Sequence, residues 1–259
     1  MTGSDILAGK TIVLTGGGAG IGWGIAQACC EKGARVFFCQ RSDEGEAKAA
    51  ELRGRGHDAQ FMVCDISSPE SISAFADAAI ERYGAVHGLI NNAGVTIEGD
   101  FLTFPLADLD RLWSTNVRSI FLLTQALVPA MPHGSAVVNV SSNHSVSSVA
   151  GYEMYAGTKG AISAMTRAMA WSLGQRGIRA NTLSPGLTRT EAVQEVINAS
   201  PELERGFNAM HADSAFATIG EIGGVAAFLV SDASKAITGA DLVADHGMAA
   251  QLCRDDELK

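Results

Sequence analysis

Short apolar runs alternate along this chain with longer stretches in which apolar residues recur at helical spacing. This alternation is typical of a parallel β-sheet whose strands are covered by helices on both faces. The runs are too apolar to face water on one side, as expected for covered strands. The predicted strands are Thr11–Thr15, Arg35–Cys39, Asp58–Val63, Gly88–Asn91, Ala136–Ser141, Ile178–Leu183 and Asp241–Ala244. The predicted helices are Ile21–Lys32, Asp43–Gly54, Pro69–Tyr83, Leu106–Ala130, Tyr152–Gln175, Thr190–Met210 and Glu221–Val230.

The pattern continues over all 259 residues without a linker rich in proline or serine, a repeat or a low-complexity block. An α/β fold of about 250 residues commonly forms one domain. We therefore expect residues 1–259 to form a single α/β domain, a doubly wound parallel sheet of the Rossmann type with helices on both faces.

Charge and cysteine content narrow the possible partners and the compartment. Lys and Arg total 19 and Asp and Glu total 28, so the formal net charge of −9 disfavours a nucleic acid partner. Residues 1–10 contain no apolar signal core, and prolines and polar side chains interrupt the uncharged segment 119–152. We expect a cytoplasmic protein with reduced thiols, no membrane partner and no bound metal. The cysteines, which lack the paired spacing of a zinc site or redox motif, are Cys29, Cys30, Cys39, Cys64 and Cys253.

The first predicted strand, Thr11–Thr15, runs directly into a glycine-rich segment, Gly16–Gly22, and then into a helix. Glycine permits positive φ and close backbone approach, and a helix N-terminus presents free N–H groups to an anion. The segment fits the spacing Thr-Gly-x-x-x-Gly-x-Gly through Gly16, Gly20 and Gly22, but it does not fit G-x-G-x-x-G. We interpret it as a cradle for the pyrophosphate of a dinucleotide. The alternative is an ordinary flexible turn.

The residues after the second predicted strand indicate which dinucleotide would bind. An Asp or Glu about twenty residues beyond the glycine-rich turn would bind the ribose hydroxyls and repel a 2′-phosphate. This chain has Gln40 followed by Arg41, which favours NADP over NAD; alternatively, Arg41 lies on the surface beside the acidic residues that follow it. Asp65, after the third predicted strand, could accept a hydrogen bond from the adenine amine or cap the turn Ser67–Pro69.

Tyr155 and Lys159 lie four residues apart on a predicted helix, so both side chains point the same way. A phenol with a pKa of about 10 is a poor base at neutral pH, and an adjacent cation lowers that pKa. Ser141 and Ser142 follow a strand at the sheet edge where ligands bind in such folds. Asn116 interrupts an apolar helix, where an amide needs buried partners. These residues are candidates for acid–base chemistry.

In this order, the motifs resemble those of the short-chain dehydrogenase/reductase family over essentially the whole chain. The matching motifs are Thr15–Gly22, Asn91–Gly94, Asn116, Ser142, Tyr155 with Lys159, and Ser184–Gly186. The resemblance implies that Tyr155 is the general acid/base and that Ser142, rather than Ser141, hydrogen-bonds the substrate oxygen. Lys159 would hold the nicotinamide ribose and lower the pKa of Tyr155. Asn116 would order a water in the proton relay.

The resemblance also implies a nicotinamide cofactor along the sheet edge, in a single domain that binds the dinucleotide and carries catalysis. The implied cofactor-binding residues are Gly16, Gly18, Gly20, Ile21, Gly22, Gln40, Arg41, Asp65, Ile66, Asn91, Ala93, Gly94, Tyr155, Lys159, Pro185, Gly186, Thr188 and Thr190. Asn92 would tie strands together. His87 and His246 depart from the commonest family pattern outside the implied proton relay. Ala19 weighs against NADP, because NADP-preferring relatives often carry a basic residue there.

The implied reaction is hydride transfer between NADP, or NAD, and a secondary alcohol or carbonyl. Substrate contacts are expected from Ser142, Asn143, His144, Glu153 and Tyr155, and also from Glu191 and His211. This polar set favours a sugar or polyol. A 3-oxoacyl or cyclic-ketone reductase is the rival enzyme. The alternative for the polar set itself is that half of its side chains face solvent. A non-catalytic nucleotide-binding scaffold or redox sensor is the alternative of a different class, although the intact catalytic set favours an enzyme.

The family resemblance further suggests a homotetramer, with subunit contacts through the predicted helices Leu106–Ala130 and Tyr152–Gln175. Packing at such contacts, rather than a ligand cage, is the expected role of Trp113, Trp171, Met165 and Met169. No paired ligand spacing supports a metal site made by His144, His211 and His246.

Overall fold

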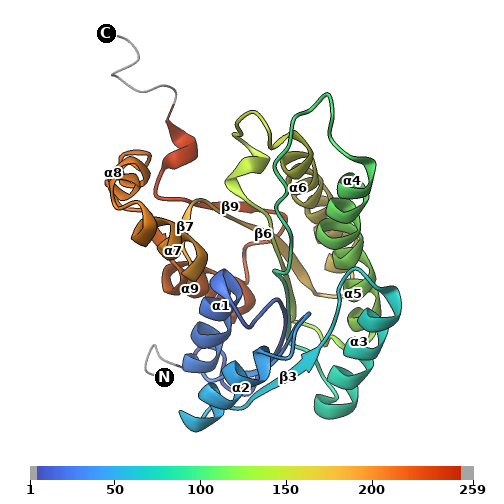
Figure 1. Ribbon diagram of the computed structural model, residues 1–259. Helices are drawn as coiled ribbons and strands as arrows, with labels where there is room; N and C mark the ends of the chain where they lie inside the picture. The colour runs from blue at the N-terminus through green and yellow to red at the C-terminus, as the bar shows by residue number, and fades with distance from the viewer. Residues whose placement is uncertain (1–4, 252–259) are drawn as a thin grey trace.

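Seven parallel strands form one sheet in the computed structural model of the protein, which describes residues 5–251 (Figure 1). The strands are β1 (Thr11–Thr15), β2 (Arg35–Gln40), β3 (Ala59–Val63), β4 (Gly88–Asn91), β5 (Ala136–Val140), β6 (Arg179–Pro185) and β9 (Asp241–Ala244). Their order across the sheet is β3-β2-β1-β4-β5-β6-β9. Because the winding reverses between β1 and β4, the carboxyl ends of these two strands flank the crevice where such sheets bind ligands. Two short strands, β7 (Thr188–Arg189) and β8 (Ala217–Thr218), pair outside the sheet.

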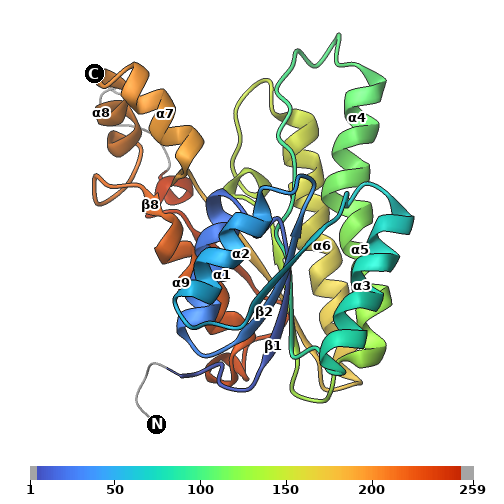
Figure 2. The same cartoon turned by 60° about the horizontal axis from the view of Figure 1, so that its bottom comes forward.

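Helices cover both faces of the sheet (Figure 2). They are α1 (Gly20–Glu31), α2 (Gly45–Gly54), α3 (Pro69–Tyr83), α4 (Leu106–Trp113), α5 (Ser119–Leu127), α6 (Glu153–Gly174), α7 (Glu191–Ala199), α8 (Glu202–Ala209) and α9 (Ile219–Val230). Helices α1, α2 and α9 lie against one face, and α3, α5 and α6 lie against the other. Within residues 5–251, no helix has both the length and the apolar character needed to cross a membrane.

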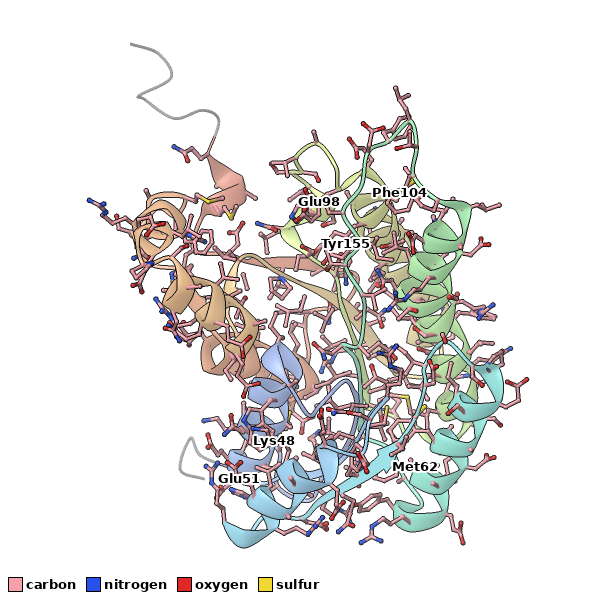
Figure 3. All side chains as sticks on the ribbon, viewed as in Figure 1. Lys48, Glu51, Met62, Glu98, Phe104 and Tyr155 are labelled. Carbon is pink, nitrogen blue, oxygen red and sulfur yellow. The ribbon has the colours of Figure 1, made fainter. Side chains whose placement is uncertain are left out.

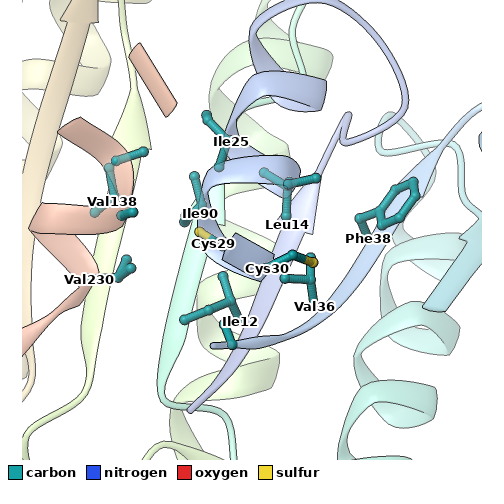
Figure 4. Packing of buried hydrophobic residues seen from close by; sticks show 14 of the residues in the cluster. Ile12, Leu14, Ile25, Cys29, Cys30, Val36, Phe38, Ile90, Val138 and Val230 are labelled. Atoms are coloured by element: carbon teal, nitrogen blue, oxygen red, sulfur yellow. The ribbon is translucent and has the colours of Figure 1, made fainter. Parts of the chain in front are cut away.

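The strands are buried on both sides, which explains their near-continuous apolar sequence. Ile12 and Leu14 of β1 pack toward α1 and α9, among the residues labelled in Figure 4. Val13, between them, points to the opposite face and belongs to the cluster that contains Phe75 of α3 and Leu123 of α5. Successive strand side chains alternate between faces, so two cores, one on each face, hold the sheet in place.

The structure confirms the predicted fold class, and the seven strands have ends that differ from the predicted ones by at most two residues. One helix prediction is wrong: residues 190–210 form two helices, not one, because the non-helical backbone of Ser200 and the ring of Pro201 interrupt the helical hydrogen bonds between α7 and α8. The predicted helix over residues 106–130 also contains a π-helical turn, Ser114–Arg118, between α4 and α5.

Candidate active site

The turn after β1 has the conformation that the glycine spacing predicts. Gly16 and Gly20 have φ of +69° and +50°, values that glycine adopts without steric cost. A Cβ on Gly22 would overlap the carbonyl oxygen of Gly16, so only glycine lets α1 begin this close to the turn. The N–H groups of Gly16 and Gly17 donate to the Cys39 carbonyl at 2.7 and 3.1 Å. The turn is thereby fixed to β2 in front of the N-terminus of α1, a geometry that suits a phosphate group.

A cavity of about 600 Å³ opens beside this turn, a volume within the usual range for ligand pockets. Its lining includes the predicted cofactor-binding residues Gly16, Ile21, Gly22, Gln40, Arg41, Asp65, Ile66, Ala93, Gly94 and Thr190. The other predicted cofactor-binding residues lie outside this lining: Gly18, Gly20, Asn91, Tyr155, Lys159, Pro185, Gly186 and Thr188. The cavity therefore unites residues from the β1, β2, β3 and β4 ends that are distant in the sequence.

Residues at the ends of β2 and β3 form one wall of the cavity. A Cβ on Gly18 would overlap Gln40 Oε1, so the Gln40 side chain covers the glycine-rich turn. Arg41 is exposed and lines the cavity. Asp65 Oδ1 accepts hydrogen bonds from Ser67 Oγ at 2.7 Å and Ser67 N at 2.8 Å. These bonds, with a smaller effect of Arg41, lower the pKa of Asp65, which caps the turn and faces the cavity at the same time.

The two asparagines at the end of β4 have different roles. Asn92 Nδ2 donates to the carbonyls of Thr15 and Gly16 at 3.0 and 3.2 Å, so it ties β4 to β1 as expected. The Asn91 side chain instead turns into the core, where Nδ2 donates to Asn139 Oδ1 at 2.8 Å. Any contact between Asn91 and a ligand in the cavity would therefore come from its backbone.

The structure brings the predicted catalytic side chains together at the carboxyl edge of the sheet, where Figure 3 labels Tyr155. Tyr155 and Lys159 lie in the first two turns of α6, and Lys159 Nζ is 5.5 Å from the centroid of the Tyr155 ring. The Ser142 side chain lies near the phenol and lowers the pKa of Tyr155. A Cβ on Gly94 would lie 3.7 Å from Lys159 Nζ and 3.1 Å from Asn116 Oδ1. Gly94 lines the cavity, so the ammonium and the phenol lie beside it.

The two neighbouring serines, Ser141 and Ser142, have different hydrogen-bond partners. Ser141 Oγ donates to the carbonyl oxygen of Lys159 at 2.8 Å and so serves to hold α6 on β5. Ser142 Oγ accepts a hydrogen bond from the His144 N–H at 3.2 Å, and the Ser142 side chain lowers the pKa of the Tyr155 phenol. The geometry therefore favours Ser142 as the hydroxyl that meets a substrate oxygen.

The expected effect of Lys159 on the pKa of Tyr155 is wrong for this structure. Burial raises the pKa of Tyr155, and the side chains of Thr96 and Ser142 oppose that rise only in part. Burial also lowers the pKa of Lys159, to about 8. Lys159 Nζ donates to the Val140 carbonyl at 3.2 Å and lies over the Tyr155 ring.

The Asn116 amide is fully engaged within the protein. Its Oδ1 accepts from Val95 N at 2.8 Å, and its Nδ2 donates to Val95 O at 2.9 Å and to Thr158 Oγ1 at 3.1 Å. The predicted water contact would therefore come from the backbone of Asn116. Asn116 lies in the π-helical turn Ser114–Arg118, and such turns break the regular backbone bonding and are frequent at functional sites.

Two residues that were not predicted from the sequence, Glu98 and Tyr152, join His144 near the phenol. Tyr152 Oη donates to Glu98 Oε2 at 3.1 Å, and a backbone hydrogen bond also joins the two loops that carry them (Figure 3). The His144 ring centroid lies 4.9 Å from that of Tyr152 and 5.5 Å from that of Tyr155. No local spacing relates Glu98 to Tyr152, so only the fold reveals the contact.

Asp245, a buried carboxylate, is a further residue of this region that was not predicted from the sequence. It accepts a hydrogen bond from Asn143 Nδ2 at 3.4 Å and from the N–H groups of Gly247 and Ala249 at 3.0 and 2.8 Å. A Cβ on Gly186 would lie 2.5 Å from Asp245 Cβ, so Gly186 packs directly on this carboxylate. Asn143, predicted to touch substrate, is thus committed to a buried partner.

Other predicted substrate contacts are dispersed. Glu153 and Glu191 are exposed at the first residues of α6 and α7. His211 is buried, with Nδ1 2.7 Å from a backbone carbonyl oxygen of α8. His246 Nδ1 lies 2.7 Å from Asp213 Oδ2. His144 Nδ1 lies 2.9 Å from a serine hydroxyl. Each of the three histidines considered as metal ligands therefore has a different partner within the protein.

The chain is similar to known proteins over most of its length. Residues 16–249 match the family model described as enoyl-(acyl carrier protein) reductase. The chain is 34% identical over 253 residues to a 2,5-dichloro-2,5-cyclohexadiene-1,4-diol dehydrogenase of Sphingobium indicum, covering 94% of this chain and 98% of that protein. It is 31% identical over 256 residues to a 3-alpha-(or 20-beta)-hydroxysteroid dehydrogenase of Mycobacterium tuberculosis, covering 98% and 94%. A short-chain dehydrogenase/reductase structure from Serratia marcescens BCRC 10948 superposes with a TM-score of 0.88 at 30% identity, covering 94% and 99%.

Proposed function

The chain belongs to the short-chain dehydrogenase/reductase family and is an oxidoreductase of that type, and we propose that it transfers hydride between NADP and a secondary alcohol or carbonyl. The observation that carries this proposal is the meeting of Tyr155, Ser142 and Lys159 beside the cavity of the glycine-rich turn. A buried lysine is costly, and a nucleotide-binding scaffold without catalysis has no need of it. The whole chain would act as one dinucleotide-binding and catalytic domain.

Tyr155 would move the proton at the substrate oxygen. Because burial raises its pKa, the phenol is protonated at neutral pH and is ready to act as an acid in carbonyl reduction. Alcohol oxidation needs the phenolate, so its rate should rise with pH over the alkaline range. Ser142, beside the same phenol, would donate a hydrogen bond to that oxygen. Lys159 would hold the nicotinamide ribose, the other role that the family resemblance implies for it.

The residues of the cavity fit a nicotinamide dinucleotide, which when bound would supply or accept the hydride. Gly22 has no room for a side chain, and the N-terminus of α1 that begins at the turn presents backbone N–H groups. The end of β2 carries Gln40 and Arg41 where a ribose-binding carboxylate would stand. The exposed Arg41 guanidinium suits a 2′-phosphate, and this supports NADP over NAD.

We favour a substrate with several hydroxyl groups, a sugar or a polyol. Glu98, Tyr152 and His144 surround the phenol with groups that can donate or accept hydrogen bonds. The related dehydrogenase of Sphingobium indicum is named for a ring that bears two hydroxyls, which is consistent with this class.

A cyclic-ketone or hydroxysteroid-type substrate is the second candidate. Val146 and Val149, on the loop between the catalytic Ser142 and Tyr155, are 61% and 64% exposed. Exposed apolar side chains beside a site favour an apolar ligand. The relative of Mycobacterium tuberculosis is named for a steroid substrate.

We also expect a homotetramer in the cytoplasm, acting on a small molecule without a nucleic acid or membrane partner. Trp113, Phe121 and Trp171 are 43%, 55% and 81% exposed on α4, α5 and α6. A groove of about 350 Å³ between α5 and α6 is lined in part by Met165 and Met169. Apolar surface of this kind, on helices of the same face, suits subunit contacts.

Removal of the phenol oxygen tests the catalytic part of the proposal. Tyr155→Phe should keep nucleotide affinity within a few-fold and lower turnover by at least about a hundredfold, the scale of general acid–base catalysis. Ser142→Ala should also lower turnover, whereas Ser141→Ala should lower stability more than turnover, because Ser141 bonds to α6. Near-normal turnover of Tyr155→Phe would remove this residue from the proposed role.

Nucleotide titration tests the cofactor part. Fluorescence titrations with NADPH and NADH should show tighter NADPH binding, and Arg41→Ala should weaken NADPH much more than NADH. Equal losses of affinity for NADPH and NADH would show that Arg41 does not recognise the 2′-phosphate. A panel of sugars, polyols, cyclic ketones and 3-oxoacyl esters, run with the tighter cofactor, then separates the substrate classes.

A further inference from the structure

Two cysteines meet at the carboxyl ends of neighbouring strands. Cys39 is the penultimate residue of β2, Cys64 directly follows β3, and Cys64 N donates to Gln40 O at 2.9 Å. Both side chains pack on the same face of the sheet, in the cluster that contains Ile72 and Phe75 of α3. Cys64 Sγ donates to the Ser71 carbonyl at 3.4 Å, and each of the two thiols shifts the pKa of the other, as expected of neighbouring sulfur atoms. The C-x-x-C spacing of the common redox motif is absent, so only the fold reveals this pair.

The two thiols differ in their access to the cavity. Cys39 is fully buried, whereas Cys64, although only 2% exposed, lines the proposed nucleotide cavity. A small reagent in the cavity therefore reaches Cys64 first. The neighbouring Cys39 thiol lowers the pKa of Cys64, and burial raises the pKa of Cys39. Cys29 and Cys30, adjacent in α1, are also buried with raised pKa values, which makes them internal controls.

The pair is attached directly to the cradle. The Cys39 carbonyl accepts the hydrogen bonds of Gly16 N and Gly17 N, which fix the glycine-rich turn. Cys64 precedes Asp65, which lines the same cavity. A covalent bond between the sulfur atoms would draw the ends of β2 and β3 together and displace one or both of these attachments.

We propose that Cys39 and Cys64 form a peroxide-sensitive dithiol that closes to a disulfide and thereby weakens nucleotide binding; the second part rests on the proposed function. The Cys64 thiolate attacks one oxygen of hydrogen peroxide, the O–O bond breaks, and hydroxide leaves and is protonated to water. Cys64 is then a sulfenic acid. The Cys39 sulfur gives up its proton and attacks the Cys64 sulfur, the S–O bond breaks, and a second water leaves. Two thiols are oxidised to one disulfide, and the peroxide is reduced to two waters.

Peptide mapping of the full chain tests the bond itself. Trypsin places Cys39 in residues 36–41, Cys64 in residues 56–82, and both Cys29 and Cys30 in residues 11–32. The reduced protein is treated with hydrogen peroxide, its free thiols are alkylated, and the digest is analysed by mass spectrometry without reductant. We expect residues 36–41 and 56–82 to be cross-linked with the loss of two hydrogens. Oxidation of Cys64 to a sulfinic acid without a cross-link, or equal oxidation of residues 11–32, would overturn the proposal.

Nucleotide titration of the same samples tests the consequence. The oxidised protein should bind NADPH at least about tenfold more weakly, a difference of about 1.4 kcal/mol, and dithiothreitol should restore binding. Bound NADPH should slow formation of the cross-link, because it covers Cys64. A cross-link that leaves the affinity unchanged would refute the regulatory part. If the reduced protein binds neither NADPH nor NADH, the proposed function and this regulatory part both fail, but the mapping still decides whether the bond forms.

Variants assign the roles of the two sulfur atoms. Cys64→Ala should abolish the peroxide effect on binding, and Cys39→Ala should stop the reaction at a sulfenic acid that dimedone traps on residues 56–82. Cys29→Ala is the matched control, a buried thiol whose loss should leave the peroxide response intact. Thermal unfolding of each reduced variant checks that it is folded. A normal peroxide response in folded Cys64→Ala would contradict the assignment.

Discussion

Lys159 places a positive charge in the interior of the protein, and its removal should stabilise the fold. The side chain is 5% exposed, and Nζ donates to the Val140 carbonyl at 3.2 Å. Burial lowers its pKa from 10.5 to about 8. Between these two pH values the unfolded chain therefore binds more protons than the folded chain. The buried charge lowers the free energy of unfolding most at low pH, and this penalty disappears as the pH rises from about 8 to 10.5.

The size of this effect follows from the pKa. A fall from 10.5 to about 8 corresponds to roughly 3 kcal/mol for the charged form. Lys159→Met keeps the length of the side chain and removes the charge, but it also removes the hydrogen bond to Val140, worth about 1 kcal/mol. We expect the variant to be more stable by about 2 kcal/mol at pH 7. The gain should shrink by about 2 kcal/mol by a pH of about 9.5.

Urea unfolding of both proteins at a series of pH values, without nucleotide, measures this difference directly. Lys235→Met is the matched control, because Lys235 is exposed and its removal should give no pH-dependent change. Lys159→Met should also lose turnover, because catalysis by the unsubstituted protein uses a charge that the fold opposes. A variant that is less stable at pH 7, or a gain that does not depend on pH, would refute the reasoning.

Three further results are expected. Gly22→Ala should lower the free energy of unfolding by about 3 kcal/mol, because its methyl group would overlap the Gly16 carbonyl, and it should abolish nucleotide binding. Gly157→Ala, at an open position of α6, should instead raise stability by about 0.5–1 kcal/mol, and both are measured by urea unfolding and titration. Asp213→Asn should slightly lower the melting temperature at pH 5.5 and not at pH 9, because the pKa of His246 is raised by Asp213 and the stabilisation is lost as the pH rises through that value. An equal effect at both pH values would exclude this ion pair as the cause.

The parts of the site that could be predicted from the sequence are those encoded over short distances. The glycine spacing fixes the turn after β1, and one helical turn separates Tyr155 from Lys159. The break at Pro201 was missed, although proline is a visible signal, because the apolar spacing on both sides continues a helical pattern. Asp245 and Asn143, 102 residues apart, could not be paired from the sequence, because no local preference relates them.

The wrong expectation for the pKa of Tyr155 has a different origin. The four-residue spacing shows that Lys159 lies on the same side of the helix as the phenol, but it carries no information about burial. In the fold, the same packing that brings the two groups together also removes water from both. Desolvation raises the pKa of the phenol and lowers that of the ammonium, so both shifts favour the neutral forms.

Helix α6 is attached to the sheet by polar groups as well as by apolar packing. Asn139 Nδ2 donates to Thr166 Oγ1 at 2.9 Å, and Ser163 Oγ donates to Asp241 Oδ2 at 2.6 Å. Near the start of the helix, Ser141 makes a third link, to the backbone of α6. Apolar contacts alone allow a helix to slide by small amounts, whereas buried hydrogen bonds fix its register because an unsatisfied group is costly. A phenol that must meet a substrate oxygen within hydrogen-bond distance needs this precision, which explains why the buried face of α6 keeps polar residues that cost stability.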